Sequence, residues 1–108
     1  MLRDMKTVQR GVRVLPLRVK GTGTAAVQEG NAHATLVDNG VGDWTLTFRQ
    51  PFTRTPVVTI GSVNVAIVKM MAVSTTAVQI QAFEVDGTTA KDIDFHLLVC
   101  GFDVADQT

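Results

Sequence analysis

A short segment of strictly alternating polarity limits what this chain can fold into. In the segment "WTLTF", Trp44, Leu46 and Phe48 share one parity, whereas Thr45 and Thr47 share the other. Successive side chains of a β-strand point to opposite faces of its sheet, so the segment predicts a strand with an apolar and a polar face. We therefore expect Trp44 in the core rather than on a surface where it would stack on a sugar.

Further segments of similar length are rich in β-branched residues and are bounded by Gly, Pro or Asn, which predicts an all-β chain. The Asn39-Gly40 dipeptide predicts a tight turn, and "GTGT" and "QEGNA" interrupt the strand pattern. Pro16 has no N–H to donate, so its strand is expected at a sheet edge or with a bulge. The predicted strands are 11–20, 33–38, 41–48, 57–60, 63–73, 75–85 and 93–102.

The length of 108 residues fits one domain. About seven to eight short antiparallel strands at this spacing are typical of a β-sandwich or jelly roll. The sequence therefore predicts a single antiparallel β-sandwich, jelly-roll-like, over residues 11–108, preceded by a polar and basic N-terminal arm over residues 1–10. Pro51 and Pro56 are expected to end one strand and precede the next.

The charge balance argues against general binding to nucleic acid or to a membrane surface, because ten cations and ten acids leave no net charge. No apolar run approaches the ~20 residues of a membrane span, and the N-terminus has no apolar stretch of signal-peptide length. We therefore expect synthesis in a cytosol-like compartment, and either retention there or a place on a particle assembled there.

Charges of opposite sign gather at the two ends of the chain. Six of the ten cations lie in the first twenty residues, and six of the ten acids lie in the last twenty-five. One interpretation is a basic arm that docks on an acidic partner; the other is that the two ends lie near each other and offset one another. The candidate partner-binding residues, including two from the 49–55 loop, are Arg3, Lys6, Arg10, Arg13, Arg49 and Arg54.

The segment 63–73 is apolar in both parities, unlike a strand with one solvated face. Its second face is therefore expected to meet a loop, the arm or another subunit. The alternative is a central strand covered on both sides within the chain. The candidate self-association residues are Ala66, Val68, Met70 and Ala72.

The sequence contains no convincing set of catalytic residues, so we expect no enzyme activity and no cofactor. Asp92, Asp94 and His96 share one face of the last predicted strand and are the best metal candidates, but the outer face of any exposed strand collects such residues, so no metal site is expected. Cys100 lies about 13 Å along the strand from His96, too far for a thiolate–imidazole pair, and is expected to be a small buried residue.

Two segments resemble small β-rich structural proteins of tailed bacteriophages: "GDWTLTFRQPFTRTPVVTIG", residues 42–61, and "AFEVDGTTAKDIDFHLLVCGFD", residues 82–103. The resemblance implies a capsid decoration (cement) or head-fibre-like protein, located in the virion and made in the host cytoplasm. Such a protein binds the outer capsid surface and stabilises the head by protein–protein contacts. The implied partner is the major capsid protein, and the implied state is a homo-oligomer, with a trimer favoured.

The alternative function is a receptor- or glycan-binding module at the tip of a phage tail or fibre. It predicts a ligand groove on loops, around Arg49–Thr55 or Asp86–Asp92.

Overall fold

The computed structural model describes residues 11–102, which form eight β-strands and no helix. The sequence-based prediction of an all-β antiparallel sandwich is confirmed for this part of the chain. The proposed arm, residues 1–10, lies outside the described residues. The strands are β1 (Val12–Lys20), β2 (Ala26–Glu29), β3 (Ala34–Gly40), β4 (Asp43–Phe48), β5 (Val57–Ser62), β6 (Ile67–Val73), β7 (Ala77–Phe83) and β8 (Phe95–Phe102).

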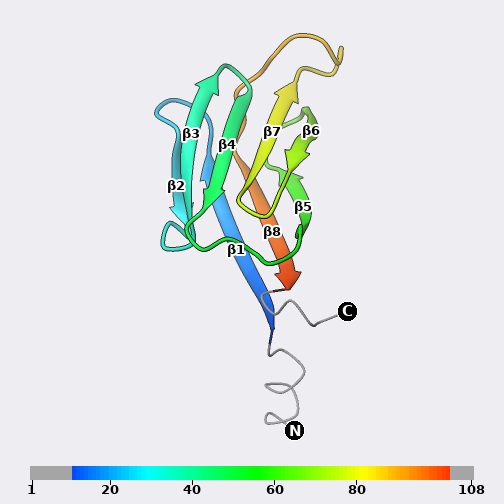
Figure 1. Cartoon of the computed structure of the whole chain (residues 1–108). Helices are drawn as coiled ribbons and strands as arrows, with labels where there is room; N and C mark the ends of the chain where they lie inside the picture. Colours follow the sequence, from blue (N-terminus) through cyan, green and yellow to red (C-terminus); the bar gives the residue numbers. More distant parts are fainter. Residues whose placement is uncertain (1–10, 103–108) are drawn as a thin grey trace, which may run out of the picture.

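The strands form two four-stranded sheets that lie face to face (Figure 1). Sheet A has the order β2-β1-β8-β5, and sheet B has the order β3-β4-β7-β6. All pairings are antiparallel. The longest pairs β1 with β8, from Val12 opposite Phe102 to Val19 opposite Phe95, so the described chain starts and ends on neighbouring strands. This agrees with the expectation that the two ends lie near each other.

The core lies between the two sheets and follows the predicted alternation. Trp44, Leu46 and Phe48 of β4 are at most 3% exposed, and the Trp44 and Phe95 ring centroids are 5.0 Å apart across the sandwich. The last strand behaves as expected too, with its inward residues fully or almost fully buried. The other sandwich-facing core residues are Leu15, Leu17, Val19, Ala34, Val78, Ile80, Ala82, Ile93, Leu97 and Val99.

Pro16 lies in β1 where that strand has a neighbour on one side only. It is opposite Leu98 of β8, whereas β2 pairs with β1 only over Arg18–Lys20, and the register with β2 shifts between Arg18 and Val19. The missing N–H therefore costs no ladder bond. β1 as a whole is an inner strand of sheet A, so the edge alternative is wrong, whereas the register shift agrees with the alternative of a bulge. The four-residue strand β2 was not predicted, because it is short and flanked by the turn-like "GTGT" and "QEGNA".

The prediction of a tight turn at Asn39-Gly40 is wrong by two residues. Both residues belong to β3, and Val41-Gly42 make the connection to β4. Gly40 and Gly42 adopt positive φ angles of 129° and 65°, whereas Asn39 does not. The Asn39 amide instead donates to Asp43 Oδ1 at 3.2 Å and Thr45 Oγ1 at 2.8 Å, which holds it on the polar outer face of sheet B.

The segment 49–56 is a loop between β4 and β5, as the two prolines predict. It is not a free loop, because Phe52 is only 3% exposed and its ring meets Phe48 edge-on at 5.2 Å. The loop therefore closes one end of the core.

The two glycines of "GTGT" provide a test of the close packing near Trp44. A Cβ at Gly21 would collide with the Ile93 backbone oxygen and lie 2.5 Å from Trp44, whereas nothing lies within 4 Å of one at Gly23. We expect Gly21→Ala to lower the free energy of unfolding by ~3 kcal/mol, because overpacking forces shifts in a dense core. The measurement is urea unfolding followed by the fluorescence of Trp44.

Gly23→Ala is the matched control. Its φ of +65° places alanine in the left-handed region, so a loss of about 1 kcal/mol is expected without any collision. Equal losses in the two variants would contradict the close approach of Gly21 to Trp44 and Ile93.

Candidate interaction surface

The outer face of sheet A is apolar over three adjacent strands. Val14, Cys100 and Val57 lie opposite one another across β1, β8 and β5. In the next row Pro16 and Leu98 are apolar and Thr59 of β5 is polar. Val57 is 70% exposed, Val14 51% and Leu98 47%. We call this surface the apolar face; its members are Val14, Pro16, Val57, Leu98, Cys100 and Phe102.

The outer face of sheet B shows what a solvated face looks like in the same protein. Its central strands present Thr45 and Thr47 beside Gln79 and Gln81. Both glutamine amides donate to the Asp43 carboxylate at 3.1 Å. Burial raises the pKa of Asp43, but hydrogen bonds from Gln79, Asn39 and Gln81 outweigh it and hold the pKa below its usual value. The central strands of the two sheets therefore differ on their outer faces, although the edge strands of sheet B also expose Val37 and Ile67.

A groove of about 660 Å³ crosses sheet A from Glu29 of β2 to Thr59, Ile60 and Gly61 of β5. Its floor includes Pro16 and Leu98, and both histidines of the chain, His33 and His96, line it. The His96 ring lies over Gly61, where any Cβ would collide with it. The groove thus combines an apolar floor with groups that can donate or accept hydrogen bonds.

An ion pair borders the groove. Arg18 Nε lies 2.6 Å from Glu29 Oε1, and their side chains are 61% and 69% exposed. At this exposure the pair contributes little to stability. It does place one cation and one anion beside the apolar floor.

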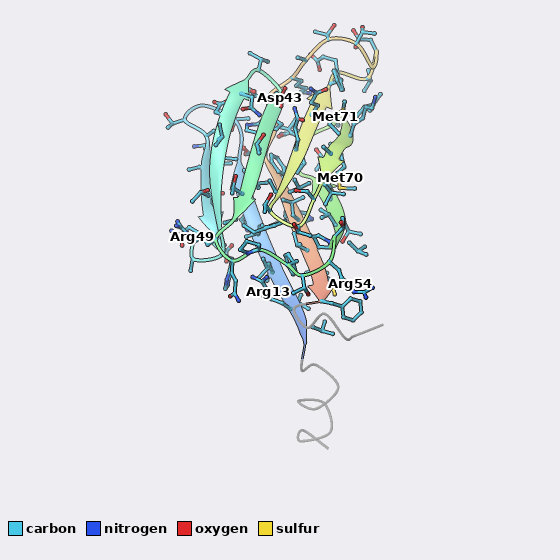
Figure 2. All side chains as sticks on the ribbon, viewed as in Figure 1. Arg13, Asp43, Arg49, Arg54, Met70 and Met71 are labelled. Atoms are coloured by element: carbon cyan, nitrogen blue, oxygen red, sulfur yellow. The ribbon has the colours of Figure 1, made fainter. Side chains whose placement is uncertain are left out.

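Different contacts hold the cationic residues that the sequence predicts to bind a partner. The Arg13 guanidinium lies 4.0 Å above the centre of the Phe52 ring and donates to the Pro51 oxygen at 3.0 Å. Arg49 Nε donates to the Asn31 oxygen at 2.7 Å. Figure 2 shows Arg13, Arg49 and Arg54 at the same end of the sandwich, although they come from different segments. Arg3, Lys6 and Arg10 lie outside the described residues.

The predicted self-association segment is divided between two faces. Ala66 and Val68 are half-buried and pack against the core. Met70 has the same inward parity, opposite Ile80, but it is 42% exposed on this edge strand (Figure 2). A bulge between Met70 and Ala72 then changes the parity, so Ala72 lies opposite Gln79 and is exposed on the outer face. The two apolar parities arise because the bulge exchanges the inward and outward sets within β6.

The predicted metal candidates have other partners. Asp94 Oδ1 accepts the Thr22 hydroxyl at 2.8 Å and the N–H groups of Gly21 and Thr22, and Asp92 Oδ1 accepts the Gly42 N–H at 2.8 Å. His96 is on the outer face of sheet A. Within residues 11–102 no group of three or more His, Cys, Asp or Glu is placed to hold a metal ion.

The carboxylate of Asp86 stabilises the loop after β7. Asp86 accepts the N–H groups of Thr88 and Thr89 at 2.9 Å and the Thr89 hydroxyl at 2.7 Å. These bonds, that of the Thr89 hydroxyl above all, lower the pKa of Asp86 to about 2. The oxygen atoms of this loop therefore organise the turn itself.

Cys100 is exposed, so the prediction that it is buried is wrong. It has the outward parity of β8, opposite Val14 and Val57. The sequence did contain a signal for the apolar face: from Leu97 onward "LLVCGF" is apolar in both parities, like 63–73. The polar residues Asp92, Asp94 and His96 of the same parity obscured it.

Comparisons with protein-family models, curated proteins and solved structures found no match for this chain. Residues 11–102 contain no helix that is long and apolar enough to cross a membrane. Evidence on function therefore comes from the surfaces of the sandwich.

Asp94 ties the loop after β1 to the start of β8, and its titration tests this contact. The Thr22 hydroxyl is the largest cause of a lowered pKa for Asp94; burial opposes it, and the N–H groups of Thr22 and Gly21 lower the pKa further. Because the pKa of Asp94 is lower in the folded state, its carboxylate stabilises the fold at pH values above the usual pKa of 3.8. This stabilisation is lost as the pH falls through the folded-state pKa.

We expect Asp94→Asn to lower the free energy of unfolding by about 1 kcal/mol at pH 7, because a charge-assisted bond becomes a neutral one. Asparagine does not titrate, so the difference from the wild type should narrow as the pH falls from 5 to 3. The measurement is urea unfolding at each pH. A difference that is constant with pH would contradict the role given to the carboxylate.

Proposed function

We propose that this protein is a non-catalytic virion structural protein, a capsid decoration protein that binds the outer surface of the major capsid protein through the apolar face. The observation that carries the proposal is the contrast between the two outer faces of the sandwich. The central strands of sheet B present a hydrogen-bonded polar surface, and its exposed Val37 and Ile67 lie apart on the two edge strands, whereas the adjacent strands of sheet A expose Val14, Val57 and Leu98 together. Exposed apolar patches of this kind mark interaction sites.

The resemblance of residues 42–61 and 82–103 to structural proteins of tailed phages supports the choice of partner. The second segment includes β8, whose outward residues Leu98, Cys100 and Phe102 contribute to the apolar face. A decoration protein needs an extended surface with many modest contacts rather than a catalytic constellation. The three arginines at one end of the sandwich (Figure 2) are placed to contact an acidic partner at the margin of that surface.

A lysine in the middle of the apolar face tests this function. We expect Leu98→Lys to weaken binding to purified capsids that lack the protein by about tenfold or more, because the charge would be desolvated at the interface. The measurement is co-sedimentation with capsids of the phage that encodes the protein.

Thr47→Lys is the matched control, since Thr47 has the outward parity on the polar face of sheet B. Its binding should equal that of the wild type. If both variants bind capsids like the wild type, the apolar face is not the capsid-binding surface. If the wild-type protein does not bind capsids at all, the decoration function is wrong.

The groove favours a second candidate function, a receptor- or glycan-binding module of a tail or fibre tip, although it lies on sheet A and not on the loops 49–55 or 86–92, where the sequence predicted it. Arg18, Glu29, His33 and His96 supply hydrogen-bonding groups around its apolar floor, as small-ligand sites require. A glycan array probed with the labelled protein tests this candidate. Binding that is lost on His96→Ala would support it, and an array without hits would reject it.

A further inference from the structure

Each sheet has two edge strands: β2 and β5 in sheet A, and β3 and β6 in sheet B. An edge strand presents backbone N–H and C=O groups that can pair with another chain. Proteins usually block such pairing with a short strand, a charged side chain or a bulge. The four edges of this protein differ in these features.

Three of the edges carry at least one of them. β2 has only four residues and ends in the charged Glu29. β3 carries Asp38, next to an irregularity in its register with β4. β6 carries Lys69 and the bulge between Met70 and Ala72.

β5 carries none of these features. Its six residues, Val57–Ser62, include no charged side chain, and they pair with β8 in an unbroken register from Val57 opposite Cys100 to Ser62 opposite Phe95. Six residues give about 20 Å of regular edge. β5 is therefore the edge strand most open to pairing in the described part of the chain.

The direction of the free backbone groups of β5 follows from one hydrogen bond. The Val63 N–H, just after the strand, donates to the Asp94 oxygen at 2.9 Å. Hydrogen-bonded pairs alternate along an antiparallel ladder, so Val57, Thr59 and Gly61 turn their N–H groups toward β8, and Val58 and Ile60 turn theirs outward. Within residues 11–102 no backbone bond to another segment reaches these two outward groups.

We propose that β5 pairs in antiparallel with β5 of a second copy of this chain, which joins the two sheets A into one continuous sheet across a two-fold axis. A strand without charges can lie beside itself without opposing like charges. The register that places Val58 opposite the second copy's Ile60 puts Thr59 next to the axis. The pairing also covers the half-buried side chains of Val58 and Ile60.

This assignment moves self-association from residues 66–72 to β5. Ala66 and Val68 are already packed against the core, whereas the outward backbone of β5 is open. Pairing along an edge leaves the apolar face uncovered and makes it continuous over two subunits. The inference does not depend on the virion role, and it gives a dimer where the phage resemblance implies a trimer.

Thr59→Lys tests the pairing, because lysine on an edge strand blocks strand addition and two lysines would meet near the axis. We expect sedimentation velocity to show a wild-type dimer, and a dimer dissociation constant at least tenfold higher for Thr59→Lys. Thr35→Lys, an exposed position of edge strand β3, should leave the dimer intact. Trp44 fluorescence and the urea midpoint establish that each variant is folded.

Hydrogen exchange of the wild-type protein is an independent measurement that needs no variant. The Val58 and Ile60 amides should exchange more slowly as the protein concentration rises through the dimer dissociation constant. A monomer at all concentrations, a trimer, a dimer equally weakened by Thr35→Lys, or fast exchange of both amides in the dimer would each overturn the proposal.

Discussion

The packing of Trp44 against Phe95 across the two sheets is the contact on which the rest of the sandwich depends. The two rings have centroids 5.0 Å apart and both residues are fully buried. Gly21 lies against the indole, where no larger residue fits, and Asp94 holds the segment 21–22 in place. Because side chains alternate along each strand, burying Trp44 and Phe95 also decides which residues point outward.

That alternation produces two outer faces of different character. On β4 and β7 the outward residues are threonines and glutamines that bond to one another and to Asp43. On β8 they are His96, Leu98, Cys100 and Phe102, next to Val14 and Val57. The outward residues of the central strands are thus polar on one side of the core and mostly apolar on the other. The apolar face is suited to a partner protein, while the regular edge of β5 is suited to a second copy.

The sequence predicted the parts of the fold that depend on local periodicity. The β4 and β8 core residues, the loop between Pro51 and Pro56 and the irregular register of the strand that contains Pro16 all follow from alternation or from proline chemistry. Three features were missed because each depends on a specific pairing or side-chain contact that alternation does not predict. β2 exists because it pairs with β1, the turn moved to Val41-Gly42 because Asn39 bonds to Asp43 and Thr45, and Phe52 is buried because it packs on Phe48.

For the candidate site residues, too, some features follow from the sequence and others only from the folded structure. The partner-binding role of Arg13 stays a prediction, and only the folded chain brings its guanidinium over Phe52. Val68 and Ala72 share a parity in the sequence and yet face opposite sides of sheet B, because a bulge lies between Met70 and Ala72. By itself the sequence determined which residues alternate, and hence that the chain forms sheets around Trp44, Leu46 and Phe48. The tertiary structure decided which strands are edges and which outward residues gather into one face, because strand order and register join segments that are far apart in the chain.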